Sequence, residues 1–151
     1  MRVLAFADEP PPVDAAELVA LNHPDAVVTL GDLQPDWIAS LGTLDLPRLG
    51  VHGNHDGEHQ LTTLGIRDLH LARRLPAADV LLCHCPPWGV NDEPDDPAHA
   101  GFMALRDWVE RHALRYLLHG HTTPDPRTQV RRIGATEVVW VRGAVVLELR
   151  R

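Results

Sequence analysis

The chain has 151 residues, 44% of them hydrophobic, and carries a formal net charge of −7. That length fits one domain, and the acidic balance offers no strongly basic face, so duplex nucleic acid is not an expected partner. All fourteen basic residues are arginine and the one serine is Ser40, which argues against Schiff-base lysines, P-loops and serine nucleophiles. Ten histidines and many aspartates favour metal or acid–base chemistry.

Hydropathy and cysteine spacing predict where the protein resides. No apolar run is long enough to span a bilayer, and the first residues resemble a strand more than a signal peptide. Cys83 and Cys85 lie too close along a predicted strand to form a disulfide, which is typical of a reducing compartment. We therefore expect a cytoplasmic protein without a membrane partner.

Short apolar strands alternate with helices along most of the chain. Five strands are predicted in turn, at residues 2–7, 26–30, 46–51, 80–83 and 116–118. Helices are predicted at residues 14–21, 36–41 and 102–112, and the last is clearly amphipathic. The tail changes to three strands expected to pair consecutively as antiparallel neighbours, at 128–133, 137–141 and 144–149. This order predicts one α/β domain over residues 1–151 with a β-rich end.

Polar, metal-competent residues follow each of the five predicted strands. They are Asp8, Asp32, Asn54, His84 and His121. In open α/β sheets, ligands bind beyond the carboxyl ends of the strands, so these side chains are expected to converge at one edge. A mixed set of carboxylate, amide and imidazole ligands suits divalent ions such as Mn²⁺, Fe²⁺ or Zn²⁺.

The same residues resemble the motifs of the calcineurin-like metallophosphoesterases. In the family's order the chain has Asp8-Glu9-Pro10, Gly31-Asp32, Gly53-Asn54-His55-Asp56, His84 and Gly120-His121-Thr122-Thr123. The stretch from His84 to Gly89 is similar to the His-x-Pro-Pro-x-Gly motif of small class III-like phosphodiesterases. The resemblance implies a four-layer α-β-β-α sandwich.

Two departures from the family pattern fall on the same metal site. The family has histidine where this chain has Pro10 and Thr123, and proline has no side-chain donor. The resemblance therefore implies one tight site, held by Asp32, Asn54, His84 and His121, and one weak site that keeps Asp8 and the bridging Asp32. Mn²⁺ is the expected ion, with Fe²⁺, Zn²⁺, Ni²⁺ and Mg²⁺ as alternatives. Glu9, Asp36 and Asp125 are candidates to compensate for the missing ligands.

The activity implied by the resemblance is metal-dependent hydrolysis of a phosphoester, more a diester than a monoester, by attack of a metal-bound hydroxide. His55 would serve the leaving group, with Asp56 orienting it. The substrate would be a small phosphoester or a nucleotide. The rival interpretation is a pseudo-phosphoesterase that keeps one metal and binds a nucleotide or a protein. The oligomeric state stays open, with a homodimer as one alternative.

Several residues beside these motifs have two interpretations. Trp88 either stacks on a base or packs beside Pro87, and His99 either contacts a substrate phosphate or is an ordinary surface histidine. His119 belongs either to the surroundings of the metal ligands or to the core. Residues 92–97 are acidic and proline-rich, which indicates a surface loop that is either a solvated connection or a functional lid, the former being favoured. A structural zinc bound by Cys83 and Cys85 is the weakest alternative.

Overall fold

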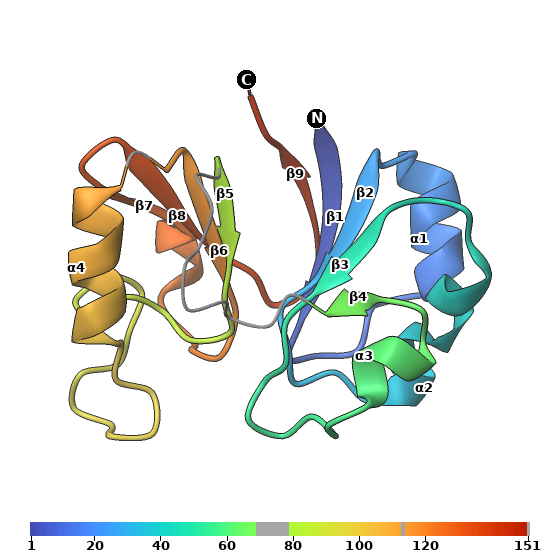
Figure 1. Ribbon diagram of the computed structural model, residues 1–151, viewed down its shortest axis with the longest axis horizontal. Helices are drawn as coiled ribbons and strands as arrows, with labels where there is room; N and C mark the ends of the chain where they lie inside the picture. The colour runs from blue at the N-terminus through green and yellow to red at the C-terminus, as the bar shows by residue number, and fades with distance from the viewer. Residues whose placement is uncertain (69–78, 113, 151) are drawn as a thin grey trace. The chain divides into compact units, whose positions relative to one another are not determined.

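The computed structural model describes residues 1–68, 79–112 and 114–150, and the chain divides into two compact units (Figure 1). Unit 1 contains described residues 1–68 and 141–150, and unit 2 contains described residues 79–112 and 114–140. Each unit has one sheet that is mostly parallel, so the predicted α/β class is confirmed. The expectation of a single domain over residues 1–151 stays a prediction.

Unit 1 is built on a five-stranded sheet in the order β4-β3-β2-β1-β9. Its parallel strands are β1 (Arg2–Ala7), β2 (Ala26–Thr29), β3 (Arg48–Gly50) and β4 (Arg67–Asp68). The edge strand β9 (Gly143–Glu148) runs antiparallel to β1. Three helices cover one face of this sheet (Figure 1): α1 (Ala15–Asn22), α2 (Pro35–Ile38), which continues as a 3-10 turn over Ala39–Thr43, and α3 (Gln60–Thr63).

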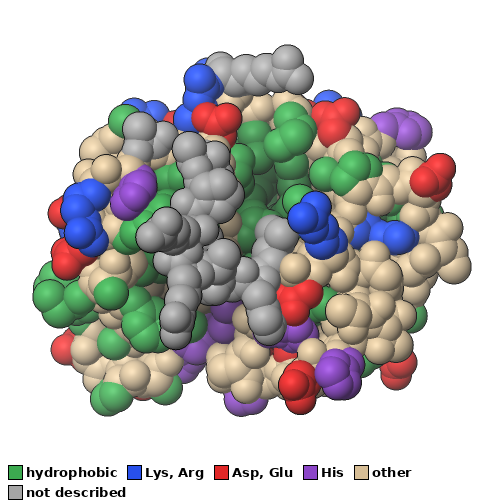
Figure 2. All heavy atoms as spheres, in the orientation of Figure 1, with side chains coloured by type: hydrophobic (Ala, Val, Ile, Leu, Met, Phe, Trp, Pro, Cys, Tyr) green, Lys and Arg blue, Asp and Glu red, His purple; other side chains and the backbone are tan. Residues whose placement is uncertain are grey.

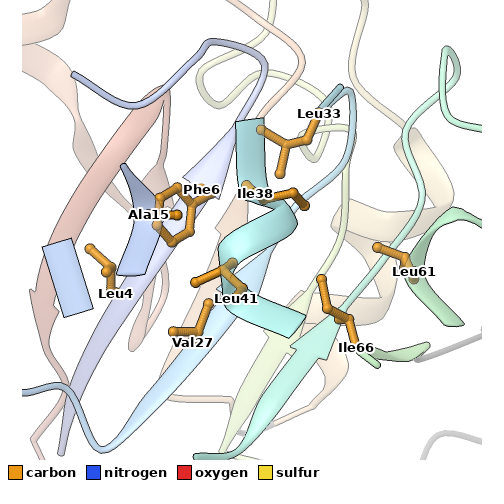
Figure 3. Close-up of a cluster of buried hydrophobic side chains, with 9 residues drawn as sticks. All are labelled: Leu4, Phe6, Ala15, Val27, Leu33, Ile38, Leu41, Leu61 and Ile66. Atoms are coloured by element: carbon orange, nitrogen blue, oxygen red, sulfur yellow. The ribbon is translucent and has the colours of Figure 1, made fainter. Parts of the chain in front are cut away.

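The core of unit 1 explains why these segments fold as they do. Five of the six residues of β1 are buried, as expected for an apolar strand with neighbours on both sides. Helix α1 begins where the Asp14 carboxylate accepts the N–H groups of Ala16 and Glu17, an N-cap. Figure 3 shows the side chains that pack between sheet and helices: Leu4, Phe6, Ala15, Val27, Leu33, Ile38, Leu41, Leu61 and Ile66.

Unit 2 is built on a four-stranded sheet in the order β5-β6-β8-β7. Strands β5 (Val80–Leu82), β6 (Tyr116–His119) and β8 (Thr136–Trp140) are parallel, and β7 (Val130–Ile133) pairs antiparallel with β8. Helix α4 (Met103–Arg111) buries Val109, with Leu105 and Trp108 packed on the same core, so its predicted amphipathic face is confirmed. A 3-10 turn spans Pro126–Thr128.

The predicted run of three consecutive antiparallel strands is wrong in its last member. Strands β7 and β8 pair as expected, but β9 leaves for the sheet of unit 1 and pairs with β1 over six residue pairs. The reason is that β8 already has β7 on one side and β6 on the other, so it has no edge left for β9. Only Val141 and Arg142 separate β8 from β9, and Gly143 then adopts a left-handed φ of 65°.

The surface of the protein mixes charges of both signs (Figure 2). On the face shown in Figure 2, arginine side chains lie among acidic and apolar ones. Several arginines form ion pairs with a neighbouring carboxylate, as Arg106 does with Glu110 and Arg132 with Glu137. Among the described residues, no helix combines the length and the apolar character that crossing a bilayer requires.

Candidate functional site

In unit 1, Asp8 and Asp32 follow two neighbouring parallel strands, as the sequence predicts. Both have a positive φ, 60° for Asp8 and 55° for Asp32, a conformation that aspartate tolerates better than most residues. The backbone N–H of Asp8 donates to the carbonyl of Gly31 at 3.3 Å, so the turn after β1 is attached to the turn after β2. The two predicted carboxylate ligands of unit 1 therefore lie on adjoining turns.

The loop that carries Asn54 and His55 wraps around Asp32. Oδ1 of Asp32 accepts the backbone N–H of His55 at 2.8 Å. A Cβ atom added to Gly53 would lie 2.1 Å from that same oxygen and 2.5 Å from the backbone nitrogen of Asp32, closer than any side chain permits. Glycine at position 53 is therefore a steric requirement of this approach, and Asn54 and His55 are exposed beside the Asp32 carboxylate.

Asp56 holds this loop in place through its carboxylate. Oδ2 accepts the backbone N–H groups of Asp32 at 3.0 Å and Gly53 at 2.8 Å, and Oδ1 accepts that of Leu33 at 3.1 Å. Among the described residues its other partner is the side-chain amide of Gln60, at 3.4 Å. This role in shaping the backbone was not predicted, and the predicted role of Asp56 in orienting the His55 ring stays a prediction.

A further pair in unit 1 was not predicted. Nε2 of His52 lies 3.3 Å from Oδ2 of Asp68, and both side chains are 19% exposed. His52 follows β3 and Asp68 is the last residue of β4, and these two strands are parallel neighbours. Strand β4 is only two residues long, so no apolar periodicity signalled it in the sequence. The one available signal was the histidine immediately before the Gly53 motif.

In unit 2, His84 and His121 come together as predicted. His84 follows β5 and is 7% exposed, and His121 follows β6 with a φ of 70°. Nε2 of His84 lies 3.1 Å from Nδ1 of His121, and the ring centroids are 4.8 Å apart. The backbone N–H of Gly120 donates to the carbonyl of His84 at 3.1 Å, which ties the two strand ends together.

The geometry of this histidine pair suits a shared divalent ion. Two ring nitrogens bound tetrahedrally at about 2.0–2.1 Å would be separated by about 3.3 Å, close to the 3.1 Å observed. Nε2 of His121 lies 2.8 Å from the carbonyl oxygen of Ala98, which can only accept, so Nε2 carries the proton and Nδ1 carries the lone pair. Metal-ligating histidines characteristically donate their second N–H in this way.

His119 lies in the core beside this pair. Its side chain is fully buried, Nδ1 lies 2.9 Å from the carbonyl oxygen of Gly120, and Nε2 lies 3.4 Å from the side-chain amide of Asn91. Burial, together with a smaller effect of the neighbouring rings of His84 and His121, lowers the pKa of His119 to about 4. His119 is therefore a neutral, hydrogen-bonded core residue.

The acidic loop of unit 2 is more ordered than the sequence indicated. Donor atoms of Glu93, Asp96 and His99 lie within 4.8 Å of one another, which could hold a cation. Oδ2 of Asp96 lies 2.7 Å from Nδ1 of His99, and this hydrogen bond raises the pKa of the imidazole and lowers that of the carboxyl group. Glu93 accepts both the backbone N–H and the hydroxyl of Thr123, at 2.8 and 3.0 Å. The loop is therefore bonded to the segment that follows His121.

Two of the three residues proposed to compensate for the missing ligands are engaged elsewhere. Glu9 pairs with Arg142 at 2.7 Å, and Asp125 pairs with Arg127 at 2.5 Å. Asp36 lies in the first turn of α2 and is exposed. Whether any of the three supplies the donors that Pro10 and Thr123 lack stays a prediction of the sequence.

The remaining alternatives concern Trp88 and the cysteines. The Trp88 side chain is 45% exposed, so packing beside Pro87 leaves much of its ring open to solvent. Both described cysteines, Cys83 and Cys85, are reduced, and burial raises the pKa of the Cys83 thiol. In the described ranges, neither cysteine belongs to a cluster of histidine, cysteine and carboxylate donors that could hold a metal.

Comparison with known proteins identifies the fold and no more. No family model matches the chain, and no curated protein matches it. A solved crystal structure matches with a TM-score of 0.64 and 16% identity, over 91% of this chain and 89% of its own. The crystal structure of the protein of unknown function AQ665 from Aquifex aeolicus matches with a TM-score of 0.56 and 13% identity, over 96% of this chain and 95% of the matched chain. At these identities the likeness establishes a shared fold alone.

The predicted site residues thus form one group in each unit. Asp32 is enclosed by the Asn54–Asp56 loop in unit 1, with Asp8 on the adjoining turn. His84 and His121 form a pair in unit 2. That the two groups share one ion stays a prediction of the sequence.

Proposed function

We propose that this chain is a metal-dependent phosphoesterase, with phosphodiesters as its preferred substrates. One divalent ion would be held by Asp32, Asn54, His84 and His121, the ligands that the resemblance implies, and Mn²⁺ is the ion we expect. The observation that carries the proposal is the His84–His121 pair, whose nitrogens are 3.1 Å apart. The proposal includes the four-layer α-β-β-α arrangement of the family, and the two parallel-rich sheets support it.

The residues present suit such an ion in charge and in preorganisation. His121 already has its lone pair on Nδ1, and His84 needs only to carry its own proton on Nδ1 to offer Nε2. Asp32 supplies a carboxylate, and Asp56 fixes the backbone of Asp32 by accepting its N–H. When bound, a divalent ion lowers the pKa of water and polarises a phosphoryl oxygen. His55 is exposed beside Asp32 and would donate a proton to the leaving oxygen.

The second ion of the family would bind weakly here. Asp8 remains as a ligand, but Pro10 has no donor and Glu9 pairs with Arg142. The Thr123 hydroxyl donates to Glu93. Two carboxylates with water suit Mg²⁺ or Mn²⁺ at high concentration more than a tight site. We therefore propose one tight and one weak site.

The test is turnover of bis-p-nitrophenyl phosphate with Mn²⁺. We expect His55→Ala to lower kcat by about 100-fold, the contribution of a general acid, while Mn²⁺ affinity is retained. Asn54→Ala and His84→Ala should weaken Mn²⁺ binding as well as turnover. His59→Ala, an exposed histidine in the same loop region, is the matched control and should behave as wild type. Activity that ignores all of these substitutions would come from a contaminant and would overturn the proposal.

A second experiment tests whether the two groups of ligands share one ion. Calorimetric titration of Mn²⁺ should give the same loss of the tight site in Asp32→Asn as in His84→Ala. A tight site that survives Asp32→Asn but not His84→Ala would show that the ion belongs to unit 2 alone.

A catalytically inactive binding protein is the alternative function, and Pro10 and Thr123 are the observations that favour it. Both positions lack the imidazole that a second ion would need, and the Thr123 hydroxyl is engaged with Glu93. This alternative predicts tight Mn²⁺ binding with no turnover of any phosphodiester. Retention of the exposed His55 beside Asp32 favours the enzyme.

A further inference from the structure

The loop from Glu93 to His99, in unit 2, is closed on itself by backbone hydrogen bonds. The N–H of Asp96 donates to the carbonyl of Glu93 at 2.9 Å, and the N–H of His99 donates to the carbonyl of Asp96 at 3.0 Å. The N–H of Glu93 donates back to the carbonyl of His99 at 3.2 Å. These bonds join the two ends of the loop, so it holds a defined shape despite its two prolines and its exposure.

The Asp96 carboxylate sets the orientation of the peptide units inside this loop. Oδ1 accepts the N–H of Ala98 at 2.9 Å, and Oδ2 lies 2.7 Å from Nδ1 of His99. The carbonyl oxygen of Ala98 in turn accepts the Nε2–H of His121 at 2.8 Å. The half-buried Asp96 therefore holds both sides of the Ala98 carbonyl: its carboxylate bonds the N–H of Ala98 and the ring of His99, and its backbone carbonyl accepts the N–H of His99.

Two more contacts attach the loop to the segment around His121. Glu93 accepts the backbone N–H and the hydroxyl of Thr123. The rings of His99 and His121 lie 5.1 Å apart and are tilted by 47°. The loop thus contacts this segment through the ring of His121, through its Nε2–H and through Thr123, two residues further along the chain.

We propose that the loop 93–99 is a clamp that fixes the ring of His121 in the tautomer with its lone pair on Nδ1, with Asp96 as the positioning residue. Thr123, where the resemblance has a second histidine, serves as the attachment point for Glu93. The inference rests on the proposed function in one respect, which is that His121 is a metal ligand. The arrangement of the ring is independent of the reaction.

The physical consequence is preorganisation of the metal site. Without the Ala98 carbonyl, the His121 ring could rotate and place its proton on Nδ1, and binding would then have to reverse both changes. Hydrogen-bond partners of metal-ligating histidines typically affect metal affinity by about 10–100-fold when they are removed. Because Asp96 acts one step behind the carbonyl, we expect an effect near the lower end of that range.

The test measures the His121 tautomer and metal affinity in Asp96→Ala. In the metal-free protein, ¹⁵N imidazole chemical shifts should report the Nε2–H tautomer of His121 in wild type and a mixture of tautomers in the variant. Zn²⁺ affinity, measured by calorimetry, should fall by about 10-fold. Asp95→Ala removes the same charge from an exposed neighbour and should change neither quantity.

A conservative substitution separates geometry from charge. Asp96→Asn keeps an oxygen that can accept the Ala98 N–H, so it should retain the wild-type tautomer. The clamp is refuted if Asp96→Ala keeps a single Nε2–H tautomer. It is also refuted if Asp95→Ala and Asp96→Asn show the same mixture of tautomers as Asp96→Ala. A wild-type protein that binds neither Zn²⁺ nor Mn²⁺, and whose Asp96→Ala variant still shows the expected change of tautomer, would refute the proposed function and support the clamp. Thr123→Val, which retains the backbone bond to Glu93, should show a smaller change than Asp96→Ala.

Discussion

Replacement of Asp56 by alanine should destabilise unit 1, although no apolar contact is lost. The carboxylate accepts three backbone N–H groups, from Asp32, Leu33 and Gly53. A hydrogen bond to a charged group contributes about 1.5–3 kcal/mol, which would give an upper limit of about 9 kcal/mol for the three. Because Asp56 is only half-buried, water will reach some of these amides, and we expect a loss of about 2–4 kcal/mol. The free energy of unfolding of native proteins is about 5–15 kcal/mol in total, so the variant should still fold.

Thermal unfolding and amide exchange measure this effect. A loss of that size should lower the melting temperature by about 5–15 °C in a chain of this length. The amides of Asp32, Leu33 and Gly53 should lose protection against hydrogen exchange more than the rest of β2 and β3 do. Glu58→Ala, an exposed carboxylate in the same loop, should stay within about 0.5 kcal/mol of wild type. If Asp56→Ala has the same melting temperature as the Glu58→Ala control, the three hydrogen bonds do not hold the loop and the reasoning fails.

Three other outcomes are expected. Gly53→Ala would place a methyl group 2.1 Å from Oδ1 of Asp32, and this overpacking should lower the free energy of unfolding by about 1–3 kcal/mol, measured by denaturant titration. The same substitution should weaken Mn²⁺ binding, and unaltered affinity would contradict the proposed role of Asp32. Mn²⁺ at 100 times its dissociation constant should stabilise the wild type by about 2.7 kcal/mol in thermal melts, an increment that EDTA reverses and that His84→Ala lacks. Thr123→His should raise the number of Mn²⁺ ions bound per chain, measured by metal analysis after dialysis, together with the rate; an unchanged stoichiometry would count against the assignment of the weak site.

Local features of the fold could be predicted from the sequence because local patterns determine them. The apolar run of β1 and the amphipathic spacing of α4 both appear at the expected positions. The partner of β9 could not be predicted in this way. Its own pattern suits either sheet, and the choice depends on which strand has an open edge after all the others have paired. That is a property of the complete topology rather than of residues 143–148.

The site shows the same division between local and distant information. Polar residues at strand ends were predictable because parallel strands bring their carboxyl ends to one edge of a sheet. The role of Asp56 was not, since the amides of Asp32 and Leu33 come from a turn more than twenty residues earlier. The contact of His121 with the Ala98 carbonyl likewise joins residues 23 positions apart through a backbone atom that no side-chain motif marks.

The pairing of β9 with β1 has a consequence for the order of events during synthesis. Strand β1 is translated before unit 2, and its outer neighbour β9 is translated only after the whole of unit 2. Until then one side of β1 exposes the unpaired N–H and C=O groups of a nearly fully apolar strand, a surface that recruits other extended chains. Nascent chains stalled before residue 143 should therefore be the species most dependent on chaperones, and supplying β9 as a separate peptide should rescue them.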